Sequence, residues 1–252
     1  MMAPEAGWSV PDWALPPGVR ALQTWRGSSQ GWGFNLAGHV GAPPAAVAAN
    51  RARLQAAMAG VERVAWLQQV HGTRVVDAGQ LGEGEGEGEP EADAAVTRAP
   101  GVACVVMTAD CLPVLLADDT GATVAAAHAG WRGLAAGVLE RTVATMAVAP
   151  SRLRAWLGPA IGPTAFEVGA EVRAAFLARD AGAGAAFRPA ARRDHYFADL
   201  PALATRRLQA VGIRDITASG ICTVTSVDRC PSFRRDPRAG RMASLIWRDA
   251  RA

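Results

Sequence analysis

The sequence of 252 residues contains no lysine, so all 26 of its basic residues are arginines. This absence excludes every chemistry that needs a lysine amine: Schiff bases with carbonyl substrates, attachment of pyridoxal phosphate, and the phosphate-binding lysine of a P-loop. Arginine still suits bidentate binding of carboxylate or phosphate. The formal net charge is only +3, so nothing in the charge favours nucleic acid or a membrane as a partner.

Cysteine and histidine are also scarce, with four of each. The cysteines form no C-x-x-C pair, which argues against a zinc finger, and their spacing is not that of a disulfide scaffold. Residues 1–10 lack a basic segment followed by an apolar run, and no uncharged apolar run reaches the length of about 18 residues that a membrane span needs. We therefore expect no secretory signal, no membrane span and a reducing cytoplasmic location.

Hydrophobic periodicity predicts a chain that mixes strands and helices. Two strands, at residues 61–70 and 73–77, are predicted to be joined by a tight turn at His71-Gly72. Further strands are predicted at residues 19–25, 101–107, 112–117, 122–127, 153–157, 213–224 and 242–247, and helices at 43–58, 134–146, 168–178 and 200–211, with a loop at 181–193. We expect an irregular segment at 1–18 and a single catalytic α/β or α+β domain over 19–252.

The most unusual segment is a strict alternation of glycine and glutamate over residues 82–89, followed by Pro90. Such a segment has no apolar face, so it does not suit a half-buried strand. We predict a flexible, solvated loop over residues 82–90 with no catalytic role.

Three residues that can carry chemistry stand at the ends of predicted apolar elements: His71, Cys111 and His128. Two imidazoles and one thiolate can bind a borderline-soft ion such as zinc and leave a fourth coordination position open, as catalytic zinc sites do. Copper would accept the same donors. The pattern alone leaves alternatives open, because a cysteine in an apolar run is more often part of the core and a single histidine is more often structural.

Neighbouring residues suggest supporting roles. Asp110 is a candidate to orient His71 or His128 by a hydrogen bond, with a plain turn aspartate as the alternative. Residues 128–133 open a predicted helix whose free N–H groups could hold an anion, or they form an ordinary turn. Five arginines lie between residues 228 and 241, which fits either phosphate binding or a solvated hairpin.

Taken together, these segments resemble the bacterial laccase-domain family, whose members are described as polyphenol oxidases, broad purine nucleoside phosphorylases and peptidoglycan editing factors. The resemblance extends from about residue 34 to residue 247. The segments that carry it are Phe34-Asn35-Leu36, Asn50-Arg51, Gln69-Val70-His71-Gly72, Ala92-Asp93-Ala94 with Thr97, residues 108–114, 128–133, 157–162 and 232–235, and Gly240-Arg241. The Gly-Glu alternation and Cys230-Pro231 depart from the family pattern.

The resemblance implies a fold and a site. The fold is a sandwich of mixed β-sheets with helices on the outside, the α-β-β-α order of cysteine hydrolases. His71, Cys111 and His128 are the implied metal ligands and catalytic residues, with zinc as the usual ion. Arg51 and Asn35 are implied to line the same pocket and to bind substrate or phosphate.

For function, the resemblance implies phosphorolysis of adenosine, inosine and 5′-methylthioadenosine, with related deamination of adenosine. In phosphorolysis, phosphate attacks the anomeric carbon and the purine leaves, so the site binds an anion and stabilises a developing ribosyl cation. In deamination, an activated water attacks the adenine ring. The expected partners are small molecules, a nucleoside and phosphate, rather than nucleic acid or a membrane.

Three other functions remain open. Cys111 could be the thiolate nucleophile of an amidase that edits peptidoglycan precursors, activated by His71 or His128. Copper-dependent phenol oxidation ranks lower, because four histidines cannot supply the ligands of several copper centres. A metal-storage or interaction protein is the non-enzymatic alternative, and it predicts that Cys111→Ala leaves every activity intact.

Overall fold

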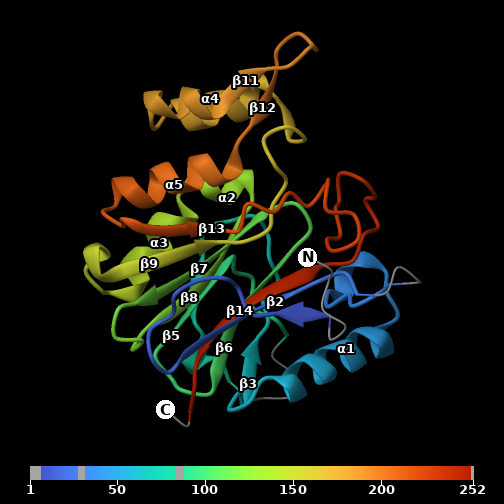
Figure 1. Ribbon diagram of the computed structural model, residues 1–252, viewed down its shortest axis with the longest axis vertical. Coiled ribbons are helices and arrows are strands. Elements are labelled where there is room, and N and C mark those ends of the chain that lie inside the picture. Colours follow the sequence, from blue (N-terminus) through green and yellow to red (C-terminus); the bar gives the residue numbers. More distant parts are fainter. Residues whose placement is uncertain (1–6, 28–31, 83–87, 251–252) are drawn as a thin grey trace.

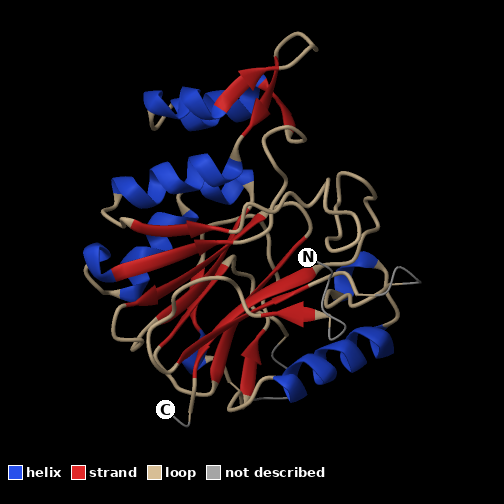
Figure 2. Ribbon diagram, viewed as in Figure 1, coloured by secondary structure: helices blue, strands red, loops and turns tan. Residues whose placement is uncertain are grey.

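A computed structural model describes residues 7–27, 32–82 and 88–250. In this part of the chain the strands form three sheets, of six, five and three strands. Figures 1 and 2 show strands stacked in the middle of the molecule and helices outside them. No helix in the described ranges has the length and apolar character that crossing a bilayer demands.

The six-stranded sheet contains β4 (Val75–Asp77), β5 (Ala94–Thr97), β7 (Leu112–Asp118), β8 (Val124–Ala129), β9 (Leu153–Leu157) and β13 (Asp215–Ala218). Their order is β13-β9-β7-β8-β5-β4. The central pairs are antiparallel, whereas each edge strand runs parallel to its neighbour.

The five-stranded sheet contains β1 (Trp8–Ser9), β2 (Val19–Thr24), β3 (Arg63–Ala65), β6 (Val102–Thr108) and β14 (Met242–Arg248), in the order β1-β2-β14-β6-β3. A small third sheet, in the order β10-β12-β11, contains β10 (Glu167–Gly169), β11 (Phe187–Pro189) and β12 (His195–Ala198). The α-helices are α1 (Pro44–Ala57), α2 (Trp131–Ala136), α3 (Val138–Met146), α4 (Ala170–Leu177) and α5 (Leu200–Ala210); short 3-10 helices cover Gly38–Val40, Ala78–Gln80, Pro150–Arg152 and Ala181–Ala186.

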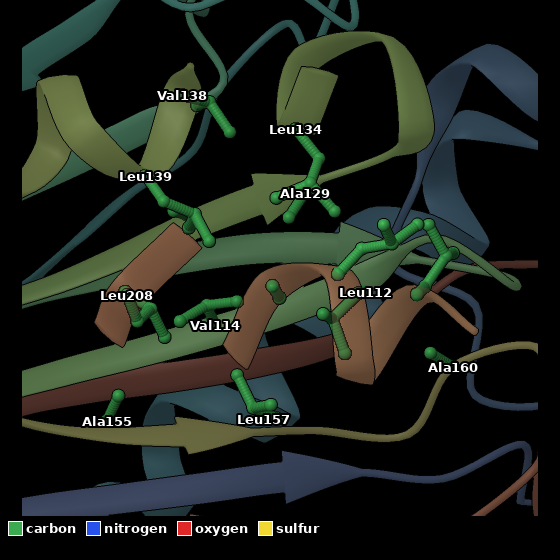
Figure 3. Close-up of a cluster of buried hydrophobic side chains, with 14 of the residues drawn as sticks. Leu112, Val114, Ala129, Leu134, Val138, Leu139, Ala155, Leu157, Ala160 and Leu208 are labelled. Carbon is green, nitrogen blue, oxygen red and sulfur yellow. The ribbon is translucent and has the colours of Figure 1, made fainter. Parts of the chain in front are cut away.

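Side-chain alternation along β7 shows how the layers are held together. Leu112 and Leu116 face a core shared with the helices, whereas Leu115 and Ala117 face a second core between the two large sheets. A strand that is buried on both faces reads as a continuous apolar run, because successive side chains point to opposite faces. Figure 3 shows the helix-side core, with Leu139 of α3 and Leu208 of α5 among its labelled side chains.

The five-stranded sheet is covered in the same way on its outer face. Along β6, Cys104 and Val106 lie in the core between the sheets, and Val105 and Met107 pack with Leu54 of α1. The layers therefore run helices, sheet, sheet, helix. This arrangement confirms the predicted α+β sandwich with α-β-β-α order.

One prediction about the topology is wrong, and the error concerns the site. The two strands expected to form a hairpin at His71-Gly72 do not pair with each other. β3 pairs with β6 in the five-stranded sheet, and β4 pairs with β5 in the six-stranded sheet. His71 therefore lies where the chain crosses from one sheet to the other. Periodicity could identify both apolar runs but not their partners, because pairing is decided by tertiary packing.

Other boundaries also differ from the sequence prediction. The helix expected at residues 134–146 is interrupted at Gly137, whose φ of 102° ends α2 and begins α3. The expected loop at 181–193 contains a 3-10 helix and β11, the helix expected from residue 168 begins after β10, and the strand expected at 213–224 is only β13. The sequence did not predict the four-residue strands β5 and β12, since so few residues show no clear period.

Three further predictions concern the N-terminal segment, the Gly-Glu loop and the domain organisation. Residues 1–18 are not wholly irregular, because Trp8 and Ser9 pair with β2. The flexible Gly-Glu loop remains a prediction, since residues 83–87 lie outside the described residues. The proposal of one catalytic domain over residues 19–252 also remains a prediction.

Candidate metal centre

The structure brings together the three residues that the sequence singled out. One donor atom from each of His71, Cys111 and His128 lies within 4.8 Å of the other two. The Cys111 Sγ is 3.7 Å from Nε2 of His71. The two imidazole rings lie 4.8 Å apart at an angle of 78°. No other group of this kind occurs among the described residues.

Each of the three residues comes from a different part of the sheet sandwich. His71 lies at the crossover between the sheets, Cys111 lies between β6 and β7, and His128 is on β8, opposite Pro113. His128 is 3% exposed, Cys111 is half-buried and His71 is exposed. The cluster therefore has a buried side at His128 and an open side at His71, from which a small molecule can approach.

Asp93, which is fully buried, holds two of the three residues in place. Its carboxylate accepts hydrogen bonds from the backbone N–H groups of Val70, His71 and Gly72, at 3.3, 2.9 and 2.6 Å. The same carboxylate lies 2.8 Å from Nδ1 of His128. A carboxylate only accepts hydrogen bonds, so Nδ1 of His128 carries a proton. In the neutral ring, Nε2 then has a free lone pair that can bind a metal ion at the cluster.

The electrostatics of Asp93 agree with this role. Burial raises the pKa of the Asp93 carboxyl, but the hydrogen bond and charge of His128 and the backbone N–H groups outweigh burial, so the pKa is lowered. Asp93 therefore stays ionised beside the imidazole.

Sequence reasoning named Asp110 as a candidate for this orienting role, with a plain turn aspartate as the alternative, and the candidate role is wrong. The Asp110 carboxylate accepts hydrogen bonds from the Thr223 hydroxyl at 2.5 Å, the Ser232 hydroxyl at 3.0 Å and the Arg234 N–H at 2.7 Å. It therefore fastens the segment around residues 223–234 to the Cys111 turn. Asp93 appeared only within one segment of the family resemblance, because a single aspartate between alanines shows no pattern.

The Cys111 thiol is unusually acidic in the metal-free protein. Burial raises its pKa, but the charges and hydrogen bonds of His128 and His71 outweigh burial and lower the pKa to about 6. Burial lowers the pKa of His128, but Cys111 and Asp93 raise it to about 9. Near neutral pH the two residues therefore form a thiolate–imidazolium pair. By contrast, burial raises the pKa of Cys230 to about 12.

We expect iodoacetamide to alkylate Cys111 of the metal-stripped protein at an unusually low pH. The thiolate is the reactive form, so the rate of alkylation should rise as the pH passes through about 6. An ordinary cysteine shows the same rise at a pH of about 8.5. Peptide mapping by mass spectrometry between pH 5 and 9 measures this dependence. Added zinc should protect Cys111, and buried Cys230 is the internal control. A midpoint above pH 8, or zinc that gives no protection, would contradict the predicted cluster chemistry.

The glycines that follow His128 are required by the cluster. A Cβ at Gly130 would lie 2.9 Å from Cδ2 of His71 and 3.0 Å from Sγ of Cys111. A Cβ at Gly133 would lie 2.7 Å from the carbonyl oxygen of Gly72. The small residues in this segment thus allow α2 to pack directly against the residues that form the site.

The donor set fits a zinc ion. Two imidazole nitrogens and a thiolate are the donors that zinc prefers, and one imidazole is fixed by a buried carboxylate, as is usual for metal-binding histidines. No fourth side chain of the described residues belongs to the group. This number of protein ligands is typical of catalytic rather than structural zinc, although copper would accept the same donors.

The two predicted substrate-binding residues, Asn35 and Arg51, differ in their surroundings. Asn35 lines a cavity of about 350 Å³ next to Arg241. Its side chain is 2% exposed. Its amide donates to the carbonyl of Ala37 and accepts from the N–H groups of Ala37 and Arg241. Asn35 thus fixes the backbone of Arg241, whose guanidinium lies within electrostatic reach of Cys111.

Arg51 does not line that cavity. Its Nε donates to the carbonyl of Leu36 at 2.8 Å, its Nη1 lies 2.6 Å from a carboxylate oxygen of Glu89, and its guanidinium stacks 3.9 Å from the ring of Trp66. Substrate or phosphate binding by Arg51 and Asn35 remains a prediction.

Comparison with known proteins confirms the family resemblance. Residues 21–249 match the family model described as multi-copper polyphenol oxidoreductase laccase. The chain is 49% identical over 244 residues to the Pseudomonas aeruginosa protein named purine nucleoside phosphorylase PA4543, and the match covers 95% of this chain and 98% of that protein. It is 48% identical over 242 residues to the Escherichia coli K12 protein named purine nucleoside phosphorylase YfiH, covering 94% and 97%.

Solved structures have the same fold. The crystal structure of Neisseria meningitidis protein NMB0706 superposes with a TM-score of 0.91 at 47% identity, covering 97% of this chain and all of that one. YlmD from Geobacillus stearothermophilus superposes with a TM-score of 0.82 at 29% identity, covering 92% of each chain. The chain therefore belongs to the family described as multi-copper polyphenol oxidoreductase laccase.

Proposed function

We propose that this protein is a purine nucleoside phosphorylase of broad substrate range, with the cluster of His71, Cys111 and His128 as its reaction centre. The observation that carries the proposal is the cluster itself: three donors from distant parts of the chain converge, with one side open to solvent. The names of two relatives that match nearly the whole chain support this reaction rather than another.

We propose zinc as the ion that His71, Cys111 and His128 hold; when bound, it would act as a Lewis acid that stabilises negative charge and lowers the pKa of water. The protein's own residues prepare the donors. Asp93 holds the proton of the neutral His128 ring on Nδ1, so that Nε2 is the nitrogen available to an ion, and it holds the turn that carries His71. Because these groups are fixed before substrate arrives, little reorganisation is needed during the reaction.

Phosphorolysis also needs a site for the phosphate. We assign phosphate binding to Arg51 and Asn35, with Asn35 acting through the N–H bond that positions Arg241. The carboxylate of Glu89 on Arg51 is the type of anion that a phosphate would replace, since the guanidinium fork matches both. Adenosine, inosine and 5′-methylthioadenosine are the proposed substrates, and phosphate the proposed second substrate.

The proposal predicts base release that depends on phosphate. Purified protein loaded with zinc should convert inosine and phosphate into hypoxanthine, and adenosine and phosphate into adenine. Chromatographic separation of the products, with and without phosphate, measures this reaction. Inosine formed from adenosine without phosphate would reveal the related deaminase activity. If neither base nor inosine appears from any of the three nucleosides, the proposed function is wrong.

A second candidate function rests on the order of groups from Asp93 through His128 to Cys111. A carboxylate, an imidazole and a thiolate in sequence form the arrangement of a cysteine hydrolase. In the metal-free protein this arrangement would favour amide hydrolysis, as in an editing amidase for peptidoglycan precursors. Amidase activity that persists after removal of zinc would favour this candidate over the phosphorylase. For either activity we propose a cytoplasmic location, because a reactive thiol stays reduced there.

A further inference from the structure

The four residues from Ser232 to Arg235 are held firmly against the protein. The Ser232 hydroxyl and the Arg234 N–H both donate to the Asp110 carboxylate, directly before Cys111 in the chain. The Arg234 guanidinium donates to the carbonyls of Ala165 and Glu167. The Arg235 guanidinium donates to three carbonyls, those of Thr223, Val224 and Cys230.

These contacts assign the polar side chains of the segment to internal roles. The side chains of Ser232, Arg234 and Arg235 all form hydrogen bonds within the protein, so they are not arranged to bind phosphate. The one side chain of this segment that is left over is Phe233. Phe233 is 51% exposed, and it is the only aromatic among the large hydrophobic residues exposed in the described part of the chain.

A single exposed apolar residue needs no explanation by itself. Phe233 differs because the residues on both sides of it are fixed to Asp110, so its backbone cannot withdraw the ring from water. The Arg241 guanidinium lies 5.8 Å from the ring centre, within the range of a cation–π contact. The ring is therefore held beside the Arg241 guanidinium, while half of the residue's surface remains accessible.

We propose that Phe233 is the stacking platform for the purine base of the substrate, and that it determines the preference for flat heteroaromatic bases. This inference rests on the proposed function, since it names the base-binding residue for that reaction. A rigid aromatic side chain with two torsions supplies contact area at a small entropic cost. A purine presents a flat face to it, as bases do to aromatic side chains in nucleic-acid complexes.

The position of Phe233 suits a base that is about to leave. Asp110 connects the Phe233 segment to the Cys111 turn by direct hydrogen bonds, so the platform is fixed to the turn that carries the Cys111 thiol. A base stacked on Phe233 would lie on the segment that Asp110 joins to the turn before Cys111. Stacking continues to hold the base as the glycosidic bond breaks, and it needs no particular base edge, which agrees with acceptance of both adenosine and inosine.

The experiment compares Phe233→Ala, Phe233→Leu and Phe233→Trp with the zinc-loaded wild type. Calorimetric titration with adenine measures binding without turnover, and steady-state phosphorolysis of inosine gives a KM for each substrate. Phe233→Ala should weaken adenine binding and raise the KM for inosine by about 5- to 150-fold, the range found when one base–aromatic stack is removed. Phe233→Leu, which is apolar but not flat, should behave like Phe233→Ala, and Phe233→Trp should stay close to wild type.

Three controls separate stacking from general damage. The KM for phosphate should be unchanged in all three variants, and their melting temperatures should match wild type because the ring is half exposed. Val10→Ala removes a more exposed apolar side chain, 74% accessible, and should change neither adenine binding nor KM.

The outcomes distinguish this inference from the proposed function. Active wild type with unaltered adenine binding and inosine KM in Phe233→Ala overturns the inference alone. Wild type that binds adenine through Phe233 but releases no base from any nucleoside overturns the proposed function alone. If Phe233→Leu retains wild-type affinity while Phe233→Ala does not, the ring acts as apolar bulk and the stacking role is also overturned.

Discussion

Cys111→Ala should lose both its bound zinc and its phosphorolysis. Cys111 supplies the only anionic donor of the cluster, and two imidazoles alone leave the ion weakly held. Replacing a residue that only orients a ligand already costs about 10- to 100-fold in metal affinity or activity. Removal of a ligand itself should therefore lower kcat/KM for inosine by more than about 100-fold.

The measurement pairs metal content by mass spectrometry with the rate of hypoxanthine release. Cys222→Ala is the matched control, because Cys222 is a half-buried thiol that accepts a hydrogen bond from the Gly162 N–H and does not belong to the cluster. It should keep both zinc and activity. Cys111→Ala with full activity would show that the cluster is not the reaction centre, and would favour the reading of a metal-storage protein.

Much of the cluster could be predicted from the sequence because its chemistry is rare in this chain. With only four histidines and four cysteines, few combinations can form a site, and the family resemblance selected His71, Cys111 and His128 among them. The spatial meeting of the three depends on a topology that the sequence did not reveal. The chain crosses from one sheet to the other at His71, where a hairpin was expected.

The supporting groups were harder to predict for a physical reason. Asp110 precedes Cys111 in the sequence, which made it a candidate to orient a histidine of the site. Successive side chains at a turn point in different directions, however, and Asp110 binds residues 223–234 instead. Asp93 is 35 positions away from the histidine that it orients. Its role depends on the contact between β5 and β8, and β5 is too short to be identified from periodicity. Local patterns thus predict elements and reactive residues, whereas the groups that orient those residues require the packed structure.

Asp93→Asn should weaken zinc binding and destabilise the protein, although the side chain keeps its shape. Oδ1 of Asp93 faces two donors, the His71 N–H and Nδ1 of His128, and Oδ2 faces two more, the N–H groups of Val70 and Gly72. An asparagine replaces one of these oxygens with an NH₂ group. In either orientation of the amide, a donor then points at donors inside the protein.

Each orientation disables a different ligand. With NH₂ in the place of Oδ1, His128 has to accept on Nδ1 and carry its proton on Nε2, which no longer serves as a donor atom to an ion. With NH₂ in the place of Oδ2, the turn that carries His71 has to move away. A buried mismatch of this kind costs about 2–5 kcal/mol, so the melting temperature of a chain of this size should fall by about 5–15 °C.

Zinc titration and thermal unfolding of Asp93→Asn measure both effects, with an expected loss of about 10- to 100-fold in zinc affinity. Asp119→Asn is the control, because its ion pair with Arg152 is exposed on both sides and contributes little. If Asp93→Asn melts with wild type but binds zinc weakly, the carboxylate tunes His128 without supporting the turn at His71. Wild-type zinc affinity in Asp93→Asn would be incompatible with a proton held on Nδ1 of His128 by this carboxylate.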